Sequence, residues 1–301
     1  MKETEIIWHN GKTIPWNNAT VHVLSHTLHY GGGAFEGIRC YETSKGTAVF
    51  RLNEHVDRLI YSSKTLNIKL PYSKDQIIEA IKNVIKLNNL KEGYIRPIAF
   101  YGYGKMGVNP KGAPVEFYIA CWPWGAYLPH DRVDIKTSQY IRIHPDSTIP
   151  DAKLCGHYLN GILASIELED TDYHEALFLD SAGFVTEGVG ENFFIVKDNN
   201  IYTPKLGGIL AGITRDTILK LAQHLGYTII EDNITLEKAY QADEAFFTGT
   251  AAEVTPIRSI DKHILGNYGE KIGPVTQKFK GAYADVVRGN NAEFFKYLTH
   301  V

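Results

Sequence analysis

The order of strand-like and helix-like segments is the feature that most limits what this chain can fold into. Strand patterning is found at residues 5–16, 25–42, 94–104, 115–124, 133–144, 175–204 and 242–261. Helical spacing of apolar residues is found at residues 54–66, 74–85, 158–169 and 215–225. Because these segments do not follow a regular strand–helix–strand rhythm, we expect an α+β fold and not a doubly wound parallel sheet.

The length of the chain and a change of pattern near its middle predict two domains. A chain of 301 residues is long enough for two hydrophobic cores. The segment from Trp124 to Arg132 contains turn residues and loses the regular pattern. We therefore expect a small N-terminal domain at 1–123, an interdomain loop at 124–133 and a large domain at 134–301.

Several residues are typical of turns and helix ends. The pair Asn10–Gly11 suits the turn of a hairpin, since both residues tolerate positive φ. Asn53 and Thr214 are plausible N-caps of the helices that follow them, and another helix follows Ser73. Gly226 is a plausible helix end.

Charge and cysteine content exclude several classes of protein. The chain has 31 basic and 34 acidic residues with no long run of either sign, which argues against a nucleic-acid partner. The first ten residues lack the apolar region of a signal peptide, and no apolar run is long enough to cross a bilayer. Three widely spaced cysteines indicate a reducing cytoplasm, and they form no disulfide framework or metal-ligand pattern.

Two glycine-rich or small-residue segments are candidates for binding an anion. GGILAGITRD leads into a helix, whose first N–H groups and positive dipole end attract phosphate. FFTGTAAEVTP is a second turn with many hydroxyl and backbone donors. TEGVGEN does not match the dinucleotide pattern G-x-G-x-x-G. Either candidate alone is equally compatible with an ordinary loop.

Four charged residues are candidates for a chemical role, and three of them lie in surroundings that favour burial or a specific partner. Lys153 has small and apolar neighbours, and a buried lysine can become a nucleophile. Glu187 lies among apolar and glycine residues, where a carboxylate needs a partner such as a protonated ring nitrogen. Arg96 lies in an apolar and aromatic strand, and Arg58 lies on a helix. Taken singly, each residue is also compatible with a surface position.

Eight motifs in a fixed order extend this reasoning from single residues to most of the chain. They are SHTLHYGGGAFEGIRCY, EHVDRL, GYIRPIAFYGYGKMGVNP, PWGAYL, AKLCGHYLN, GFVTEGVGENFF, GILAGITRD and FFTGTAAEVTP. Together they resemble the branched-chain amino-acid aminotransferases of the class IV, or fold type IV, pyridoxal-phosphate enzymes. The resemblance implies a small α/β domain and a larger domain with a pseudo-barrel of strands.

The resemblance also implies pyridoxal 5′-phosphate as the cofactor. Lys153 falls at the position of the lysine that binds the cofactor covalently as a Schiff base. Glu187 matches the carboxylate that meets the pyridine nitrogen, and Tyr158 matches the tyrosine that hydrogen-bonds the ring oxygen O3′. The other cofactor-binding positions that the resemblance implies are Arg58, Gly190, Ile213, Thr214 and Thr250.

A second set of residues resembles the family's substrate pocket. Tyr94 and the backbone of Thr250, Ala251 and Ala252 match the trap for the α-carboxylate. Arg96, with Tyr30, matches the group that receives the distal carboxylate of glutamate. The apolar lining that the resemblance implies consists of Tyr30, Phe35, Gly37, Met106, Val108, Trp124 and Tyr127.

The implied reaction is transamination between L-leucine, L-isoleucine or L-valine and 2-oxoglutarate. In the family's ping-pong mechanism, the lysine at the position of Lys153 also moves the Cα proton. Pocket residues around Met106 and Val108 reach across from a partner subunit in this family. The resemblance therefore implies at least a homodimer, with the active site near the subunit interface.

Two segments depart from the family's usual pattern, and two alternative functions stay open. Leu154, Cys155 and His157 are unusual beside the lysine, and the glycines at 31–33 suggest a tight bend or the close approach of a ligand. The first alternative is a D-amino-acid or (R)-amine transaminase, or an aminodeoxychorismate lyase, of the same fold. The second is a non-catalytic protein that keeps the fold, which the presence of both Lys153 and Glu187 disfavours.

Overall fold

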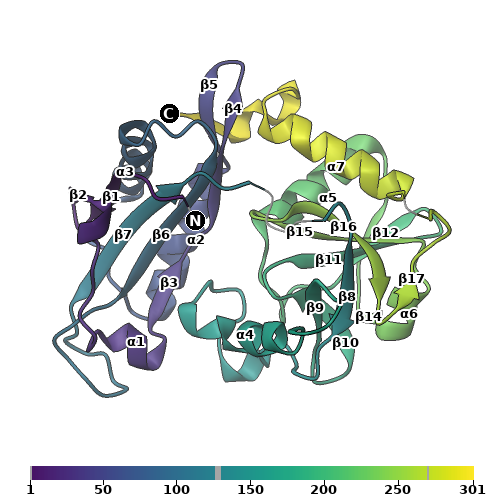
Figure 1. The fold of residues 1–301 in the computed structure, drawn as a ribbon, viewed down its shortest axis with the longest axis horizontal. Helices are drawn as coiled ribbons and strands as arrows, with labels where there is room; N and C mark the ends of the chain where they lie inside the picture. The colour runs from purple at the N-terminus through teal and green to yellow at the C-terminus, as the bar shows by residue number, and fades with distance from the viewer. Residues whose placement is uncertain (1, 126–129, 270) are drawn as a thin grey trace. The chain divides into compact units, whose positions relative to one another are not determined.

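The contacts within the chain divide it into two compact units. The computed structural model describes residues 2–125, 130–269 and 271–301 (Figure 1). Unit 1 consists of Met1–Gly125, Ala152–Gly156 and Val286–Val301, and unit 2 of Ala126–Asp151 and His157–Asp285. The predicted interdomain loop at 124–133 includes residues 126–129, which lie outside the described residues, so the predicted domain boundaries stay a prediction.

Unit 1 is built around an eight-stranded sheet. Its strands follow the order β18-β5-β4-β6-β7-β1-β2, with β3 paired to β6. The strands are β1 (Ile6–His9), β2 (Lys12–Pro15), β3 (Gly33–Phe35), β4 (Ile38–Thr43), β5 (Gly46–Phe50), β6 (Gly93–Tyr101), β7 (Val115–Trp122) and β18 (Leu298–His300). The helices are η1 (Trp16–Asn18), α1 (His26–Tyr30), α2 (Leu52–Thr65), α3 (Lys74–Leu87) and η4 (Ala292–Tyr297).

The apolar faces of α2 and α3 form one hydrophobic core with the sheet of unit 1. Val56 and Leu59 of α2 and Ile81 of α3 are fully buried in the same cluster as Ile95 and Phe117 of the sheet. Their spacing at i, i+3 and i+4 is what predicted helices at these positions. The core thus fixes the side of the sheet on which α2 lies.

The predicted element ends in unit 1 are partly confirmed. The β1–β2 hairpin turns at Asn10 and Gly11, which both have positive φ. Ser73 caps α3 through a capping box with Gln76. The N-cap predicted at Asn53 is wrong, because α2 begins at Leu52 and its N-cap is Arg51 in the left-handed region.

The glycines at 31–33 follow a short helix, whereas the sequence predicted a strand-like segment that these glycines interrupt. Residues 26–30 form α1, and Gly31 stops it with a φ of 67°. A Cβ atom at Gly31 would lie 3.0 Å from the Cα atom of Gly156, and one at Gly33 would lie 3.0 Å from the Cys155 Sγ atom. The predicted tight bend is thus found at Gly31, and the close neighbours of Gly31 and Gly33 include the segment that follows Lys153.

Unit 2 contains a ten-stranded sheet. Its strands follow the order β13-β12-β11-β15-β16-β8-β9-β10-β14, with β17 paired to β16. The strands are β8 (Val133–Thr137), β9 (Glu175–Leu179), β10 (Phe184–Gly188), β11 (Asn192–Lys197), β12 (Asn200–Thr203), β13 (Ile229–Glu231), β14 (Ile234–Thr235), β15 (Glu244–Gly249), β16 (Glu253–Ile260) and β17 (His263–Ile264). The helices are η2 (Pro145–Ser147), η3 (Cys155–Tyr158), α4 (Leu159–Ile166), α5 (Ile213–Leu225), α6 (Leu236–Tyr240) and α7 (Pro274–Val287), of which η3 and α7 extend into unit 1.

Six strands of unit 2 close into a barrel. An additional pairing of β10 with β11 joins the two ends of the series β11-β15-β16-β8-β9-β10. Glu187 and Asn192 are the residues paired at this seam. The α+β fold and the pseudo-barrel are confirmed, and the barrel seam fixes the backbone position of Glu187.

The helix and strand ends predicted in unit 2 include two errors. Gly226 ends α5 with a φ of 77°, as predicted. The N-cap predicted at Thr214 is wrong, because α5 begins at Ile213 after the N-cap Gly212. The strand predicted at 133–144 is wrong beyond Thr137, where β8 ends. Among the described residues, no helix is long and apolar enough to cross a membrane.

Candidate active site

Lys153 is held by its backbone against β3 and α2 in unit 1. Its N–H donates to the Ser62 Oγ atom at 2.9 Å, and its carbonyl accepts from the Phe35 N–H at 3.1 Å. Ala34 and Leu154 form a β-bridge and are both buried. The lysine segment is therefore an extended stretch fixed beside β3, and the Lys153 side chain is half-buried.

Two cationic groups lie near the Phe35 ring. The Lys153 Nζ atom is 4.9 Å from the ring centroid, and the Arg96 guanidinium carbon is 4.8 Å from it. Arg96 also donates to the Tyr94 hydroxyl at 3.3 Å. In the part of the chain that the structure describes, Arg96 has no carboxylate partner, and its buried Nε atom lacks a hydrogen bond. This arrangement can accept an anion beside Lys153.

Gly37 and Trp124 fix the position of Tyr94. A Cβ atom at Gly37 would lie 1.8 Å from the Tyr94 hydroxyl oxygen, so only glycine fits there. The Tyr94 and Trp124 rings meet edge to face at 4.5 Å between centroids. Four residues that the resemblance assigned to the substrate pocket thus lie together around Phe35: Gly37, Tyr94, Arg96 and Trp124.

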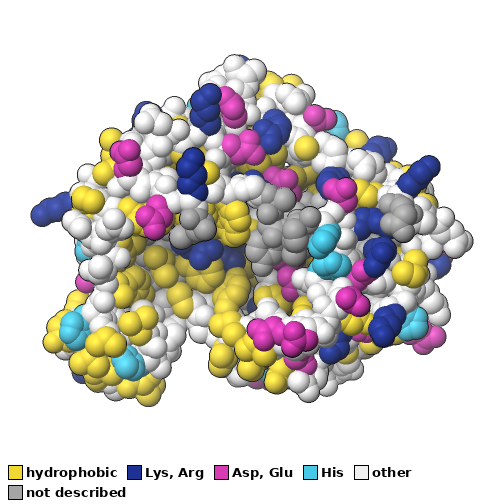
Figure 2. Space-filling view, in the orientation of Figure 1, with side chains coloured by type: hydrophobic (Ala, Val, Ile, Leu, Met, Phe, Trp, Pro, Cys, Tyr) yellow, Lys and Arg dark blue, Asp and Glu magenta, His cyan; other side chains and the backbone are white. Residues whose placement is uncertain are grey.

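Tyr30, Met106 and Val108 belong to a separate part of unit 1. The Tyr30 hydroxyl accepts a hydrogen bond from the Gly107 N–H at 3.3 Å. Met106 and Val108 are 43% and 80% exposed. Figure 2 shows many hydrophobic side chains, in yellow, at the end of unit 1 that carries α1. Tyr127, also assigned to the pocket, lies outside the described residues.

Arg58 is bound to a buried carboxylate. Its Nε and Nη2 atoms donate to Glu36 at 2.6 and 3.0 Å. His55 Nδ1 contacts the same carboxylate at 2.8 Å. Glu36 is wholly buried and Arg58 is 12% exposed. This cluster holds the guanidinium of the predicted phosphate-binding arginine in one direction.

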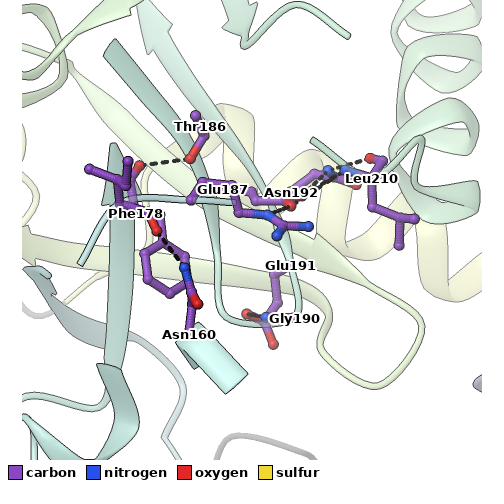
Figure 3. Close-up of polar contacts among 10 residues, drawn as sticks. Asn160, Phe178, Thr186, Glu187, Gly190, Glu191, Asn192 and Leu210 are labelled. Atoms are coloured by element: carbon purple, nitrogen blue, oxygen red, sulfur yellow. Dashed lines mark hydrogen bonds and ion pairs between the residues drawn. The ribbon is translucent and has the colours of Figure 1, made fainter. Parts of the chain in front are cut away.

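Glu187 in unit 2 is buried and hydrogen-bonded, so it does not occupy the surface position that its sequence also allowed. It is 5% exposed. Its carboxylate accepts from Arg142 Nε at 2.5 Å, from Asn192 Nδ2 at 3.1 Å and from the Leu210 N–H at 3.2 Å. Figure 3 shows Glu187 beside Asn192 and Leu210. The carboxylate is therefore fixed at the barrel seam by three donors.

Three segments for which the sequence predicted anion or cofactor binding belong to unit 2, as does the β10–β11 seam. The helix α5 begins after Gly212 without a side-chain cap, and its first turn holds Ile213 and the buried Thr214. Gly190 follows Glu187 in the β10–β11 turn, and its carbonyl oxygen would lie 3.3 Å from a Cβ atom at Gly249. The turn after Gly249 contains the residues that the resemblance assigned to cofactor or substrate binding: Thr250, Ala251 and Ala252. Tyr158, half-buried, is the N-cap of α4.

The side chains present fit the chemical groups of pyridoxal phosphate. A buried carboxylate suits the ring nitrogen, a lysine amine suits the aldehyde, and a helix start and an arginine both suit the phosphate. No cluster of metal-ligating side chains is present in residues 2–125, 130–269 and 271–301. The carboxylate, the amine, the helix start and the arginine suit a phosphate-bearing organic cofactor.

Comparison with known proteins identifies the family. The model of the class IV aminotransferases matches residues 33–260. The match covers most of the chain, which therefore belongs to the class IV aminotransferase family.

The relatives agree in their names and extend over the whole chain. The branched-chain-amino-acid aminotransferase of Pseudomonas aeruginosa is 46% identical over 300 residues, covering 98% of this chain and 97% of that protein. The enzyme of the same name from Escherichia coli K12 is 42% identical and covers 100% of this chain and 98% of its own length. A crystal structure of the branched-chain amino acid aminotransferase from T.th., complexed with N-(5′-phosphopyridoxyl)-L-glutamate, superposes with a TM-score of 0.94 at 41% identity, covering 100% and 99% of the two chains.

Three residues that support the candidate site were missed by reasoning from the sequence. Glu36, Arg142 and Asn192 each contact a residue that was singled out. Glu36 and Asn192 lie inside two of the eight motifs but were given no role, and Arg142 lies outside all eight. Asn192 is the last residue of the glycine-rich segment TEGVGEN, and that segment was a local signal that could have pointed to it.

Proposed function

We propose that this chain is a pyridoxal-phosphate-dependent aminotransferase that exchanges an amino group between branched-chain L-amino acids and 2-oxoglutarate. The observation that carries the substrate assignment is the position of Arg96 beside the Phe35 ring, which Lys153 also contacts. A cation among aromatic rings can bind the distal carboxylate of glutamate. The same rings can pack against a branched apolar side chain, so one pocket can serve both substrates.

Lys153 is proposed to bind the cofactor covalently and to move the proton at the substrate Cα atom. Its backbone is fixed by Ser62 and Phe35, while its side chain can rotate about several bonds. A fixed backbone and a flexible amine suit a group that must first hold a ligand and then act as a base.

Glu187, Tyr158 and the turns of unit 2 are proposed to orient the cofactor. When bound, pyridoxal phosphate supplies an electron sink for the negative charge that develops at the substrate Cα atom. Glu187 would hold the ring nitrogen and Tyr158 the ring oxygen. The residues proposed for the phosphate and its surroundings are Arg58, Gly190, Ile213, Thr214 and Thr250.

The substrate contacts are proposed from the groups described above. Tyr94, with the backbone of 250–252, would bind the α-carboxylate, and Arg96 the distal carboxylate. The apolar lining would consist of Tyr30, Phe35, Gly37, Met106, Val108, Trp124 and Tyr127.

A homodimer in the cytoplasm is part of the proposal. Met106 and Val108 are exposed, as are Val23 and Leu28 in the segment around α1, and a hydrogen bond from Gly107 to Tyr30 joins the two segments. Such a patch favours an interface with a second copy of the chain. The three free cysteines fit a reducing compartment.

The absorbance spectrum of the purified protein tests the proposal directly. We expect a visible band from cofactor bound to Lys153, which L-isoleucine removes and 2-oxoglutarate restores. The reason is that the first half-reaction leaves the amino group on the cofactor and the second transfers it to the oxo acid. A protein without a visible band, even after incubation with pyridoxal phosphate, would contradict the cofactor assignment.

Two controls separate the remaining possibilities. The variant Lys153→Ala should stay folded, lose the band and show no measurable transamination, and near-normal turnover would refute the role of Lys153. D-alanine and (R)-phenylethylamine should leave the band of the unmodified protein unchanged. A response to these compounds without one to L-isoleucine would transfer the function to a D-amino-acid or (R)-amine transaminase.

A further inference from the structure

The carboxylate of Glu187 is already bound to a guanidinium within unit 2. Arg142 Nε donates to Oε1 at 2.5 Å, while Asn192 Nδ2 donates to Oε2 at 3.1 Å. The Leu210 N–H lies 3.2 Å from Oε2 and 3.4 Å from Oε1. The guanidinium therefore contacts Oε1, Asn192 contacts Oε2, and the Leu210 N–H lies near both oxygens (Figure 3 labels Glu187, Asn192 and Leu210).

The backbone around Arg142 is fixed by neighbouring elements. The Arg142 N–H donates to the Leu179 carbonyl at the end of β9 at 2.8 Å. The preceding residue, Ile141, accepts a hydrogen bond from Asn160 Nδ2 on α4 at 2.9 Å. The Arg142 side chain is only 12% exposed. Arg142 is thus held in place on both sides, as a residue that positions another side chain must be.

The position of the charge decides where a shared proton lies. Coulomb interaction decreases with distance, so a guanidinium in contact with a carboxylate stabilises the ionised carboxylate strongly. The same guanidinium repels a positive charge on a ring nitrogen that is bound on the far side of the carboxylate. This repulsion is weaker than the attraction, because the nitrogen is farther from the guanidinium than the carboxylate is. In a carboxylate–ring nitrogen pair, the guanidinium therefore favours the form in which the proton is on the nitrogen.

We propose that Arg142 is a positioning residue that keeps Glu187 ionised and oriented, so that the proton shared with the cofactor stays on the ring nitrogen. The inference rests on the proposed function, in which Glu187 meets that nitrogen. The proton transfer involved is simple: the O–H bond of a protonated Glu187 would form only if the N–H bond of the ring broke. Arg142 opposes that exchange and so maintains the ring as an electron sink.

The test compares the protein with the variants Arg142→Gln and Arg142→Lys, each loaded with pyridoxal phosphate labelled with ¹⁵N in the ring. The ¹⁵N chemical shift reports directly whether the nitrogen carries a proton. We expect a protonated nitrogen in the unmodified protein, a shift toward the neutral nitrogen in Arg142→Gln, and recovery of most of the protonated signal in Arg142→Lys. We also expect kcat to fall by roughly 10–100-fold in Arg142→Gln with a much smaller change in KM, as for outer partners of ligating side chains.

Arg258→Gln is the matched control. Arg258 Nε donates to the Asp134 carboxylate at 2.7 Å in the same unit, so this variant also removes a guanidinium from a carboxylate. It should leave the ¹⁵N shift unchanged. An unchanged ¹⁵N shift in Arg142→Gln would overturn the inference, as would equal shifts in Arg142→Gln and Arg258→Gln.

The outcomes distinguish this inference from the proposed function. If the unmodified protein binds no cofactor, the proposed function fails and the inference fails with it. If the unmodified protein binds cofactor with a protonated nitrogen and the Arg142 variants do the same, only the inference fails. If Arg142→Gln does not fold, Arg142→Lys provides the test, because it keeps the positive charge. A neutral ring nitrogen in Arg142→Lys would contradict the inference that this charge keeps the nitrogen protonated.

Discussion

At the scale of single residues, the cluster around Glu36 determines the direction of the Arg58 guanidinium. Burial would raise the pKa of Glu36, but the charge of Arg58 and the hydrogen bond from His55 hold that pKa well below its usual range. Burial lowers the pKa of His55, which opposes the effect of Glu36 and favours a neutral ring. Because the ionised Glu36 can only accept, His55 must donate from Nδ1.

Replacing Glu36 with Gln should strongly destabilise the protein. The change leaves Arg58 and His55 partly buried without their carboxylate, which typically costs about 3–5 kcal/mol of the free energy of unfolding. A carboxyl with a lowered pKa stabilises the fold above the pKa of the unfolded state, about 4.3, and this contribution is lost as the pH falls below that value. Urea unfolding of the cofactor-free protein at pH 7.5 therefore measures the full effect.

Glu42→Gln provides the control for this substitution. Glu42 pairs with Lys91 at 3.1 Å, but both side chains are more than half exposed. Exposed pairs contribute at most about 1 kcal/mol. Equal losses in the two variants would mean that the Glu36 cluster has no special importance for stability.

Residues with a direct chemical role could be proposed from the sequence more readily than the residues that support them. Lys153 and Glu187 lie in short motifs whose composition already suggests unusual surroundings. Arg142 is 45 positions from Glu187, and Glu36 is 22 positions from Arg58. Such pairs depend on the tertiary fold, so no local pattern predicts them.

At the scale of elements, the start of α5 is coupled to the barrel seam through one glycine. A Cβ atom at Gly212 would lie 1.9 Å from Asn192 Oδ1. Asn192 in turn donates to Glu187 and to the Leu210 carbonyl at 2.9 Å. The position of the helix start and the position of the Glu187 carboxylate are therefore set together.

Gly212→Ala should disturb both of these features. The added methyl group must displace Asn192 or the start of α5, and overpacking of this kind costs about 1–3 kcal/mol. We expect lower stability in urea unfolding and a higher dissociation constant for pyridoxal phosphate, measured by fluorescence titration. Gly208→Ala is the control, because its Cβ atom would have no neighbour closer than 4.0 Å. If Gly212→Ala retained the stability and affinity of Gly208→Ala, Asn192 would have to be free to move.

The four helices predicted from the sequence are present, but the N-caps predicted for α2 and α5 were wrong, and α7 was not predicted. Periodic apolar residues determine which face is buried, so the existence of α2 and α5 followed from the pattern. The start of α2 depends instead on Arg51, whose N–H donates to the Tyr297 carbonyl at 2.7 Å and whose guanidinium lies 4.7 Å from the Tyr297 ring. A contact between such distant positions outweighs the local capping preference of Asn53.

At the scale of the whole molecule, the exposed apolar patch of unit 1 is the feature that bears on assembly. It combines the segment around α1 with the loop that holds Met106 and Val108, and the two are joined by a hydrogen bond from Gly107 to Tyr30. His22 and Tyr103 stack across the same junction at 3.9 Å between ring centroids. A monomer would leave these apolar side chains in water.

Val108→Glu should weaken the proposed dimer. A charge introduced at an apolar interface is desolvated on association, so we expect the dissociation constant of the dimer to rise at least about tenfold. Sedimentation velocity over a dilution series measures it. Ile264→Glu, at a position in unit 2 that is 61% exposed, serves as the control and should have no effect. A monomeric unmodified protein, or equal behaviour of the two variants, would contradict the proposed interface.

The α+β class followed from the sequence pattern, but the closed barrel did not. The barrel needs parallel pairing of β8 with β16, which joins Val133 to Ile257, and the seam pairing of Glu187 with Asn192. Patterns of burial identify strands and not their partners. Only the resemblance to a known family predicted the pseudo-barrel.

The final residues of the chain complete a sheet that the first residues begin. β18 pairs with β5 at the edge of the unit 1 sheet, and Val301 donates to the Thr47 carbonyl at 3.0 Å. During synthesis, a ribosome releases the N-terminal strands long before residues 298–301 exist. Unit 1 therefore cannot reach its complete hydrogen-bonded sheet until residues 298–301 have been synthesised, and until then the edge of β5 lacks its partner strand in the nascent chain.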